Sequence, residues 1–139
     1  MALEHRLLIF VFRRSDSGVE YLFERRHPRQ EFSWAPPHTE LGYSESLMSA
    51  ALRSMRESWH APGPMRWIDL NWCGQHQIGD FDLIDWGVGY GVPVRWDPSA
   101  LEPPPSADLL WRPLPAALAL VEEESLRRAL FRLHVEAAS

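Results

Sequence analysis

Side chains that could bind a metal ion or a phosphate gather in one stretch of the chain, between residues 34 and 61. Carboxylates and imidazoles are ordinary protein ligands of divalent cations, and this stretch supplies both. Glu57 and His60 are three residues apart, a spacing that can present both side chains together. Histidine would favour zinc, manganese or iron over magnesium. The candidate ligands in the stretch are His38, Glu40, Glu45, Glu57 and His60.

A helix is predicted to carry Glu57 and His60, beginning near Ser44 or Ser46 and ending near His60. Apolar residues recur there at helical spacing and form one stripe, made of Met48, Ala51, Leu52, Met55 and Trp59. Two prolines and a glycine within residues 61–64 end the helix. The adjacent prolines at 36–37 favour an extended segment before it.

Strands are predicted on both sides of this helix in the sequence. Apolar residues 6–13 and the β-forming residues 19–25 predict a hairpin, with Gly18 in its turn. Further strands are predicted at 66–77, 81–95 and 109–111, and helices at 116–121 and from 122 to about 135. Gly87, Gly89 and Gly91 suggest bulges or bends in the second of these strands. This order of elements predicts an α/β or α+β fold.

The segment from Trp34 to Ala61 resembles the Nudix box, G-x5-E-x7-R-E-U-x-E-E-x-G-U, in which U is a bulky aliphatic residue. The positions that match the box in register are Glu45, Arg53, Met55 and Glu57. Trp34-x-Pro36-Pro37 looks like the lead-in of Nudix enzymes that split diadenosine tetraphosphate, and Trp111 before a terminal helix also fits that subgroup. The resemblance implies one Nudix-like α/β domain over residues 1–139, with a mixed β-sheet sandwiched between helices.

Four positions depart from the box, namely Thr39, Ser54, Ser58 and His60. In the family, glutamates at the places of Ser54, Glu57 and Ser58 share one helix face and bind magnesium or manganese, which bridges the substrate's pyrophosphate. Serine hydroxyls are neutral, so the departures remove two of three carboxylates. Thr39 and His60 replace glycines, and we expect a restricted loop backbone and loss of the left-handed helix cap.

These comparisons define our candidate site residues. The candidate catalytic residues are Glu57, Glu45 and Arg53, the candidate metal ligands are Glu57, Glu45 and His60, and the candidate substrate-binding residues are Trp34, His38 and Arg26. A structural alternative is a surface ion pair between Arg53 and Glu57, four residues apart on the helix, worth roughly 0.2–0.5 kcal/mol. Arg25, Arg26 and Arg29 could bind phosphate, or they could simply be a solvated hairpin end.

Other residues with useful chemistry also have structural explanations. Aromatic residues in the predicted strands could stack on a nucleotide base, although most must fill the core: Trp67, Trp72, Phe81, Trp86, Tyr90 and Trp96. The acidic residues 122–124 could supply a general base from outside the box. As a cluster at a helix N-terminus, they are also explained by the helix dipole.

Composition excludes several classes of function. The net charge of -5 and the pI of 5.6 argue against a broad nucleic-acid-binding face. Every basic residue is arginine, so lysine chemistry such as Schiff-base formation is unavailable. The single cysteine, Cys73, excludes an intramolecular disulfide and fits a reducing compartment. No signal peptide and no apolar run of about 20 residues is visible, so we expect a cytoplasmic protein without a membrane partner.

Three functions stay open at this point. The first is a degenerate Nudix protein that binds a nucleotide or another phosphorylated small molecule, with hydrolysis weak or lost. The second is an active pyrophosphohydrolase with a rebuilt metal site, using magnesium or manganese. The third is a non-catalytic interaction scaffold that needs no cofactor. The sequence leaves the oligomeric state open, with a dimer as one option.

Overall fold

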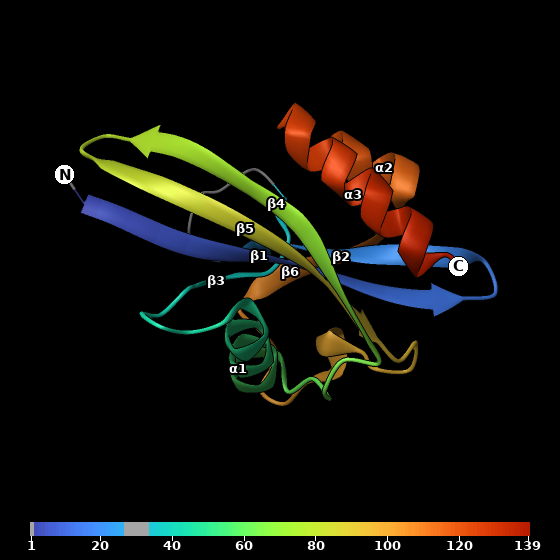
Figure 1. The fold of residues 1–139 in the computed structure, drawn as a ribbon. Helices are drawn as coiled ribbons and strands as arrows, with labels where there is room; N and C mark the ends of the chain where they lie inside the picture. The colour runs from blue at the N-terminus through green and yellow to red at the C-terminus, as the bar shows by residue number, and fades with distance from the viewer. Residues whose placement is uncertain (1, 27–33) are drawn as a thin grey trace.

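The computed structural model describes residues 2–26 and 34–139, which form one six-stranded mixed sheet with helices on both faces (Figure 1). The strands are β1 (Ala2–Ser15), β2 (Gly18–Arg26), β3 (His38–Glu40), β4 (Arg66–Ile78), β5 (Phe81–Val92) and β6 (Ala107–Pro113). The helices are α1 (Leu47–Trp59), α2 (Leu114–Leu120) and α3 (Glu124–Ala137), with a short 3-10 turn at Pro98–Ala100. None of the helices in these ranges is long and apolar enough to cross a membrane.

β1 is the central strand and has three partners. The strand order is β4-β5-β1-β2-β6, with β3 pairing β1 beside this path. β1 runs parallel to β5, from the pair Ala2 and Phe81 to the pair Arg13 and Val92. On its other edge, the end of β1 forms an antiparallel hairpin with β2, and residues 6–8 pair with β3. The β3 segment, which precedes α1 in the sequence, is therefore attached directly to the middle of the sheet.

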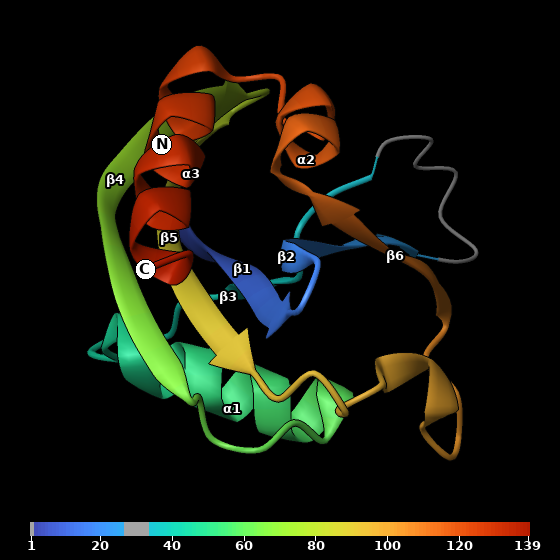
Figure 2. The ribbon, with the colours of Figure 1, turned by 90° about the vertical axis from the view of Figure 1, so that its right-hand side faces the viewer.

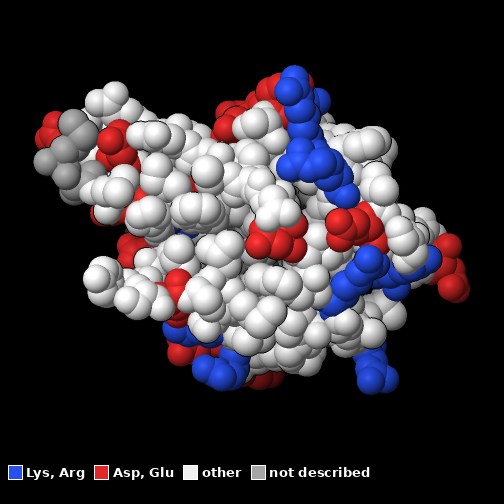
Figure 3. Space-filling model, in the orientation of Figure 1, with Lys and Arg blue, Asp and Glu red and all other residues white. Residues whose placement is uncertain are grey.

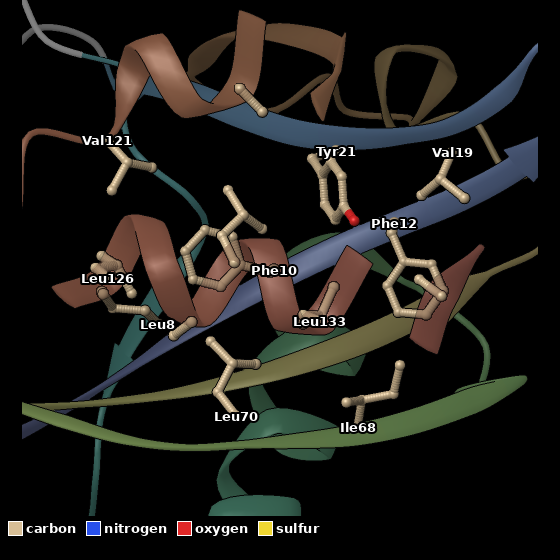
Figure 4. Close-up of a cluster of buried hydrophobic side chains, with 14 of the residues drawn as sticks. Leu8, Phe10, Phe12, Val19, Tyr21, Ile68, Leu70, Val121, Leu126 and Leu133 are labelled. Carbon is tan, nitrogen blue, oxygen red and sulfur yellow. The ribbon is translucent and has the colours of Figure 1, made fainter. Parts of the chain in front are cut away.

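The sheet separates two apolar cores (Figure 2). On one face, α1 packs through Ala50, Ala51, Met55 and Trp59 against alternate residues of β1 and β5. The opposite face is covered by α2 and α3, with Phe10, Tyr21 and Leu133 among the buried side chains there (Figure 4). This confirms the expected α/β class, a mixed sheet sandwiched between helices.

Gly18 forms the turn predicted for it, and Gly79 forms a second turn. The three glycines of β5 have a different role from the one expected. Gly18 and Gly79 have positive φ in the β1–β2 and β4–β5 turns. The predicted bulges in β5 are wrong, because the irregularity lies in β4 between Asp69 and Cys73. The β5 glycines instead admit core side chains, since a Cβ on Gly89 would lie 2.5 Å from Cδ1 of Leu133.

Two element boundaries also differ from the prediction. β5 ends at Val92 and does not reach Arg95, because Pro93 has no N–H to continue the ladder. The terminal helix continues to Ala137, because its apolar stripe remains buried as far as that residue.

Candidate functional site

Helix α1 has the bounds that its capping residues specify. Ser46 is the N-cap, and its side chain accepts a hydrogen bond from the Ser49 N–H at 3.0 Å. At the other end, His60 has φ 49 and ψ 35, the left-handed conformation. Its N–H donates to the Arg56 carbonyl at 3.2 Å. The expected loss of the left-handed cap at this position is therefore wrong, because the histidine backbone adopts the conformation that glycine would favour.

The Glu45 and Arg53 side chains form a two-point ion pair in front of α1. Arg53 Nε donates to Glu45 Oε2 at 2.8 Å, and Nη2 donates to Oε1 at 3.0 Å. The Arg53 guanidinium holds the pKa of the Glu45 carboxyl at about 2, well below its usual value. Both oxygens of this carboxylate are thus committed to a protein cation.

The same pair anchors the loop between β3 and α1. The Gly42 N–H donates to Glu45 Oε1 at 2.9 Å. Arg53 Nη2 also donates to the Glu40 carbonyl at 2.9 Å, and Nη1 to Thr39 Oγ1 at 3.4 Å. These hydrogen bonds join the loop backbone to α1 through the side chains of Glu45 and Arg53. The two predicted catalytic residues therefore position the loop.

Arg53 and Glu57 do not form the direct ion pair of the structural alternative. The hydrogen bond from Arg53 to Glu45 raises the pKa of Arg53 most, and the nearby charge of Glu57 adds to this effect. The donors of Arg53 are directed at Glu45, Glu40 and Thr39. Glu57 is exposed and forms no ion pair with any residue in ranges 2–26 and 34–139. Its carboxylate remains open to solvent.

The box positions that lack glutamate lie in contrasting surroundings. Ser54 is buried, only 5% exposed, whereas Ser58 is exposed. Thr39 lies in β3 opposite Leu7, in extended backbone where a β-branched residue is favoured. Thr39 is expected to disfavour a positive φ in the loop. The backbone at this position is extended and needs no positive φ, so the side chain causes no conflict there.

The residues along α1 do not fit a divalent cation of the kind that a Nudix box holds. Ser54 and Ser58 supply neutral hydroxyls, and both Glu45 oxygens accept from Arg53. Within the described ranges, no three His, Cys, Asp or Glu side chains are grouped so that they could hold a metal ion. The three predicted ligands, Glu57, Glu45 and His60, are therefore not grouped so that they could hold a metal ion together.

Two of the predicted substrate-binding residues, Trp34 and His38, lie on the opposite side of the sheet from the ion pair. Trp34 packs against the core beneath α2 and α3, with the Arg25 guanidinium 4.7 Å from its ring centroid. His38 is the strand partner of Leu8, which belongs to the same core, so it faces the same side. Arg26 pairs through its backbone with Ala107. Its side chain, together with His27 and Arg29, lies outside the described residues.

A buried acid that the sequence analysis did not single out lies on β5. Asp85 is 3% exposed and accepts from Arg6 Nε at 2.7 Å and Nη2 at 2.9 Å. His76 Nε2 lies 3.2 Å from Asp85 and 3.5 Å from Glu123. The available signal was an aspartate between apolar residues of a buried strand, which requires a partner. Glu123 belongs to this group on the α3 face, away from the α1 network.

Most of the strand aromatics serve the cores. Trp67, Trp86 and Trp96 pack against the core beneath α1. Trp72 packs on the α3 face, where its indole N–H donates to Ser125 Oγ at 3.1 Å. The structural explanation of these side chains is thus the better one.

Comparison with known proteins gives the same fold. No family model matches the sequence, and no curated protein matches it. Among solved structures, the Ap4A hydrolase of C. elegans is 14% identical, with 95% of this chain and 96% of that chain covered and a TM-score of 0.64. A MutT protein from Methanosarcina mazei is 17% identical, with 99% and 96% covered and a TM-score of 0.67.

A third similar structure is the NUDIX domain of NrtR from Shewanella oneidensis, solved with ADP ribose. It is 15% identical, with 95% of this chain and 88% of that chain covered and a TM-score of 0.66. Sheet order, helix placement and these structural matches together define the chain as a protein with the Nudix fold.

Proposed function

We propose that this chain is a degenerate member of the Nudix family that binds a nucleotide-like phosphorylated ligand, with metal-dependent hydrolysis weak or lost. The observation that carries the proposal is the state of the box carboxylates. Ser54 is buried and neutral, and Glu45 is paired at both oxygens with Arg53. Glu57 is thus the one box carboxylate left open to solvent among the described residues.

The fold supports a ligand that contains a diphosphate or polyphosphate linkage. The similar Shewanella domain was solved with ADP ribose, and the similar C. elegans protein is an Ap4A hydrolase. Both compounds join an adenosine to a chain of phosphates, so an adenosine polyphosphate is the ligand class to test. We place the candidate contacts at Trp34, His38 and Arg26, where an aromatic ring and cationic or polar groups could meet base and phosphate.

A hydrolysis assay separates this proposal from an active pyrophosphohydrolase. Diadenosine tetraphosphate, ADP-ribose and nucleoside triphosphates are incubated with magnesium or manganese, using the wild type and Glu57→Gln side by side. We expect no turnover above that of Glu57→Gln. The matched control is Glu102→Gln, an exposed loop glutamate that has no proposed role. Metal-dependent turnover that disappears in Glu57→Gln alone would overturn the proposal in favour of a rebuilt metal site.

A binding experiment tests the ligand directly. Isothermal titration calorimetry with ADP-ribose in excess EDTA should give a measurable dissociation constant. The proposed binding needs no metal ion, so it does not depend on the box carboxylates that Ser54 and Ser58 replace. The same ligand should raise the melting temperature, since it binds the native state preferentially. His38→Ala should weaken binding, with Glu102→Gln unchanged. Absence of binding across the panel, with or without metal, would favour an interaction scaffold.

A further inference from the structure

A cavity of about 660 Å³ lies at the end of the sheet, away from the Glu45–Arg53 network. Its walls come from the last residues of β1 and β5, the start of β4 and the C-terminal end of α3. Phe12 in its lining belongs to the core beneath α3. The volume is within the range of about 300–1,000 Å³ that small-molecule sites occupy.

The interior of this cavity is apolar and remains open to solvent. Phe12, Val92 and Pro93 line it, and the missing side chain of Gly91 leaves room for the Phe12 ring, whose Cζ would lie 3.0 Å from an added Cβ. At the rim, Met65 is 72% exposed and Val94 is 53% exposed. Large apolar side chains held in water at a concave surface favour an apolar ligand, because its binding would remove their surface from water.

The same cavity is positively charged. Arg14, Arg66 and Arg95 line it, and no Asp or Glu does so within the described residues. Arg66 and Arg95 form no ion pair with a residue of ranges 2–26 and 34–139. Arg14 uses Nη1 to donate to the Ser139 carbonyl at 2.7 Å and keeps its other donors. Basic side chains are visible at this end of the molecule, near the ends of β1 and β5 (Figure 3).

This concentration of positive charge contrasts with the whole chain, whose net charge is -5. Guanidinium groups bind carboxylate and phosphate through paired hydrogen bonds, and the apolar interior cannot satisfy them. A ligand that satisfies both parts carries one anionic head and an apolar body.

We propose that this cavity is a binding site for a small amphiphilic anion, a carboxylate or phosphate monoester with an alkyl or aryl body. The head group lies among Arg14, Arg66 and Arg95, and the body lies against Phe12 and Val92. The site is independent of the nucleotide-like ligand assigned above, because it is built from other residues.

Calorimetry with three probes of equal chain length tests the proposal. Decanoate should bind the wild-type protein, decanol should bind at least about tenfold more weakly, and decyltrimethylammonium should not bind. The double variant Arg66→Gln/Arg95→Gln should weaken decanoate binding at least about tenfold and leave decanol unchanged. Arg128→Gln, on the exposed face of α3, is the matched control and should bind like the wild type.

A second variant and a binding experiment with lipid vesicles test the proposal further. Val94→Asp changes an exposed rim residue, so the protein should stay folded by circular dichroism while decanoate binding is lost. Equal binding of decanoate and decyltrimethylammonium, or decanoate binding that is unchanged in both variants, would overturn the proposal. Binding to phosphatidylcholine vesicles that contain phosphatidic acid, without binding of free decanoate, would also overturn it in favour of a membrane surface site.

Discussion

The phenol oxygen of Tyr21, a wholly buried residue of β2, lies 2.8 Å from Nδ1 of His134 on α3. The two rings are tilted by 47° with their centroids 5.9 Å apart. Burial raises the pKa of the Tyr21 phenol and lowers the pKa of the His134 imidazole. The neutral pair is therefore favoured, and the hydrogen bond between the two side chains fixes the last turns of α3 to the sheet.

Stability should fall as His134 becomes protonated. The pKa of His134 is lower in the folded chain than its ordinary value of 6.5, so the unfolded chain takes up the proton first. The contribution is complete above about pH 6.5 and is lost as the pH falls toward the folded pKa. Urea unfolding between about pH 7.5 and pH 5 should show a smaller loss in His134→Gln than in the wild type. An identical loss in both proteins would contradict this.

The Glu45–Arg53 pair should give a pH dependence in a more acidic range. The pKa of Glu45 is lowered to about 2 in the folded chain, from 4.5. Its stabilisation is complete above about pH 4.5 and is lost as the pH falls through about 2. Glu45→Gln should therefore differ most in stability from the wild type at neutral pH and least near pH 2, while the exposed loop variant Glu102→Gln should differ at neither. A difference that grows on acidification would contradict the assignment.

His60→Gly should stabilise the protein by about 1 kcal/mol, because glycine adopts the left-handed cap without the cost that a Cβ adds. Chemical denaturation measures the gain. Ser58→Gly is the opposite control, because that residue lies within α1 and should lose about 0.5 kcal/mol. A loss of stability in His60→Gly would mean that the imidazole itself stabilises the helix end.

Gly89→Ala should destabilise the protein by about 1–3 kcal/mol, since the new methyl group would overlap the buried Leu133. The cost should shrink in a Leu133→Ala background, which removes the overlapping atoms. Gly63→Ala is the matched control, because nothing lies within 4 Å of the position of its added Cβ. An equal cost in both backgrounds would place the effect elsewhere.

The elements that the sequence predicted well are those with strong local signals. The periodic apolar stripe, the capping serine and the Pro-Gly-Pro sequence predicted both ends of helix α1 to within a few residues. Gly18 correctly predicted the turn between β1 and β2, where its φ is positive. Strand order could not be obtained in this way, because β1 pairs with β5 across much of the chain and no local pattern encodes that contact.

The candidate site was predictable in residue type but only partly in geometry. The box match identified Glu45 and Arg53, yet spacing alone suggested that Arg53 pairs with Glu57 on the same helix. The observed pairing of Arg53 with Glu45 depends on the conformation of the loop before α1, in which Ser44 has a positive φ. The His76–Asp85–Glu123 group was missed, because its members come from three elements that meet only in the folded sheet.

The three partners of β1 have a consequence for the order in which the sheet can be completed during synthesis. β1 and β2 can form their hairpin as soon as both have left the ribosome. The parallel ladder with β5 must wait until Phe81 and the residues after it have been made, because Ala2 pairs with Phe81. Until then, the apolar strand at residues 6–13 has an unpaired edge, which is the kind of surface on which nascent chains aggregate. A chaperone or slow translation before β5 should therefore alter the yield of folded protein more than it alters the stability of the finished molecule.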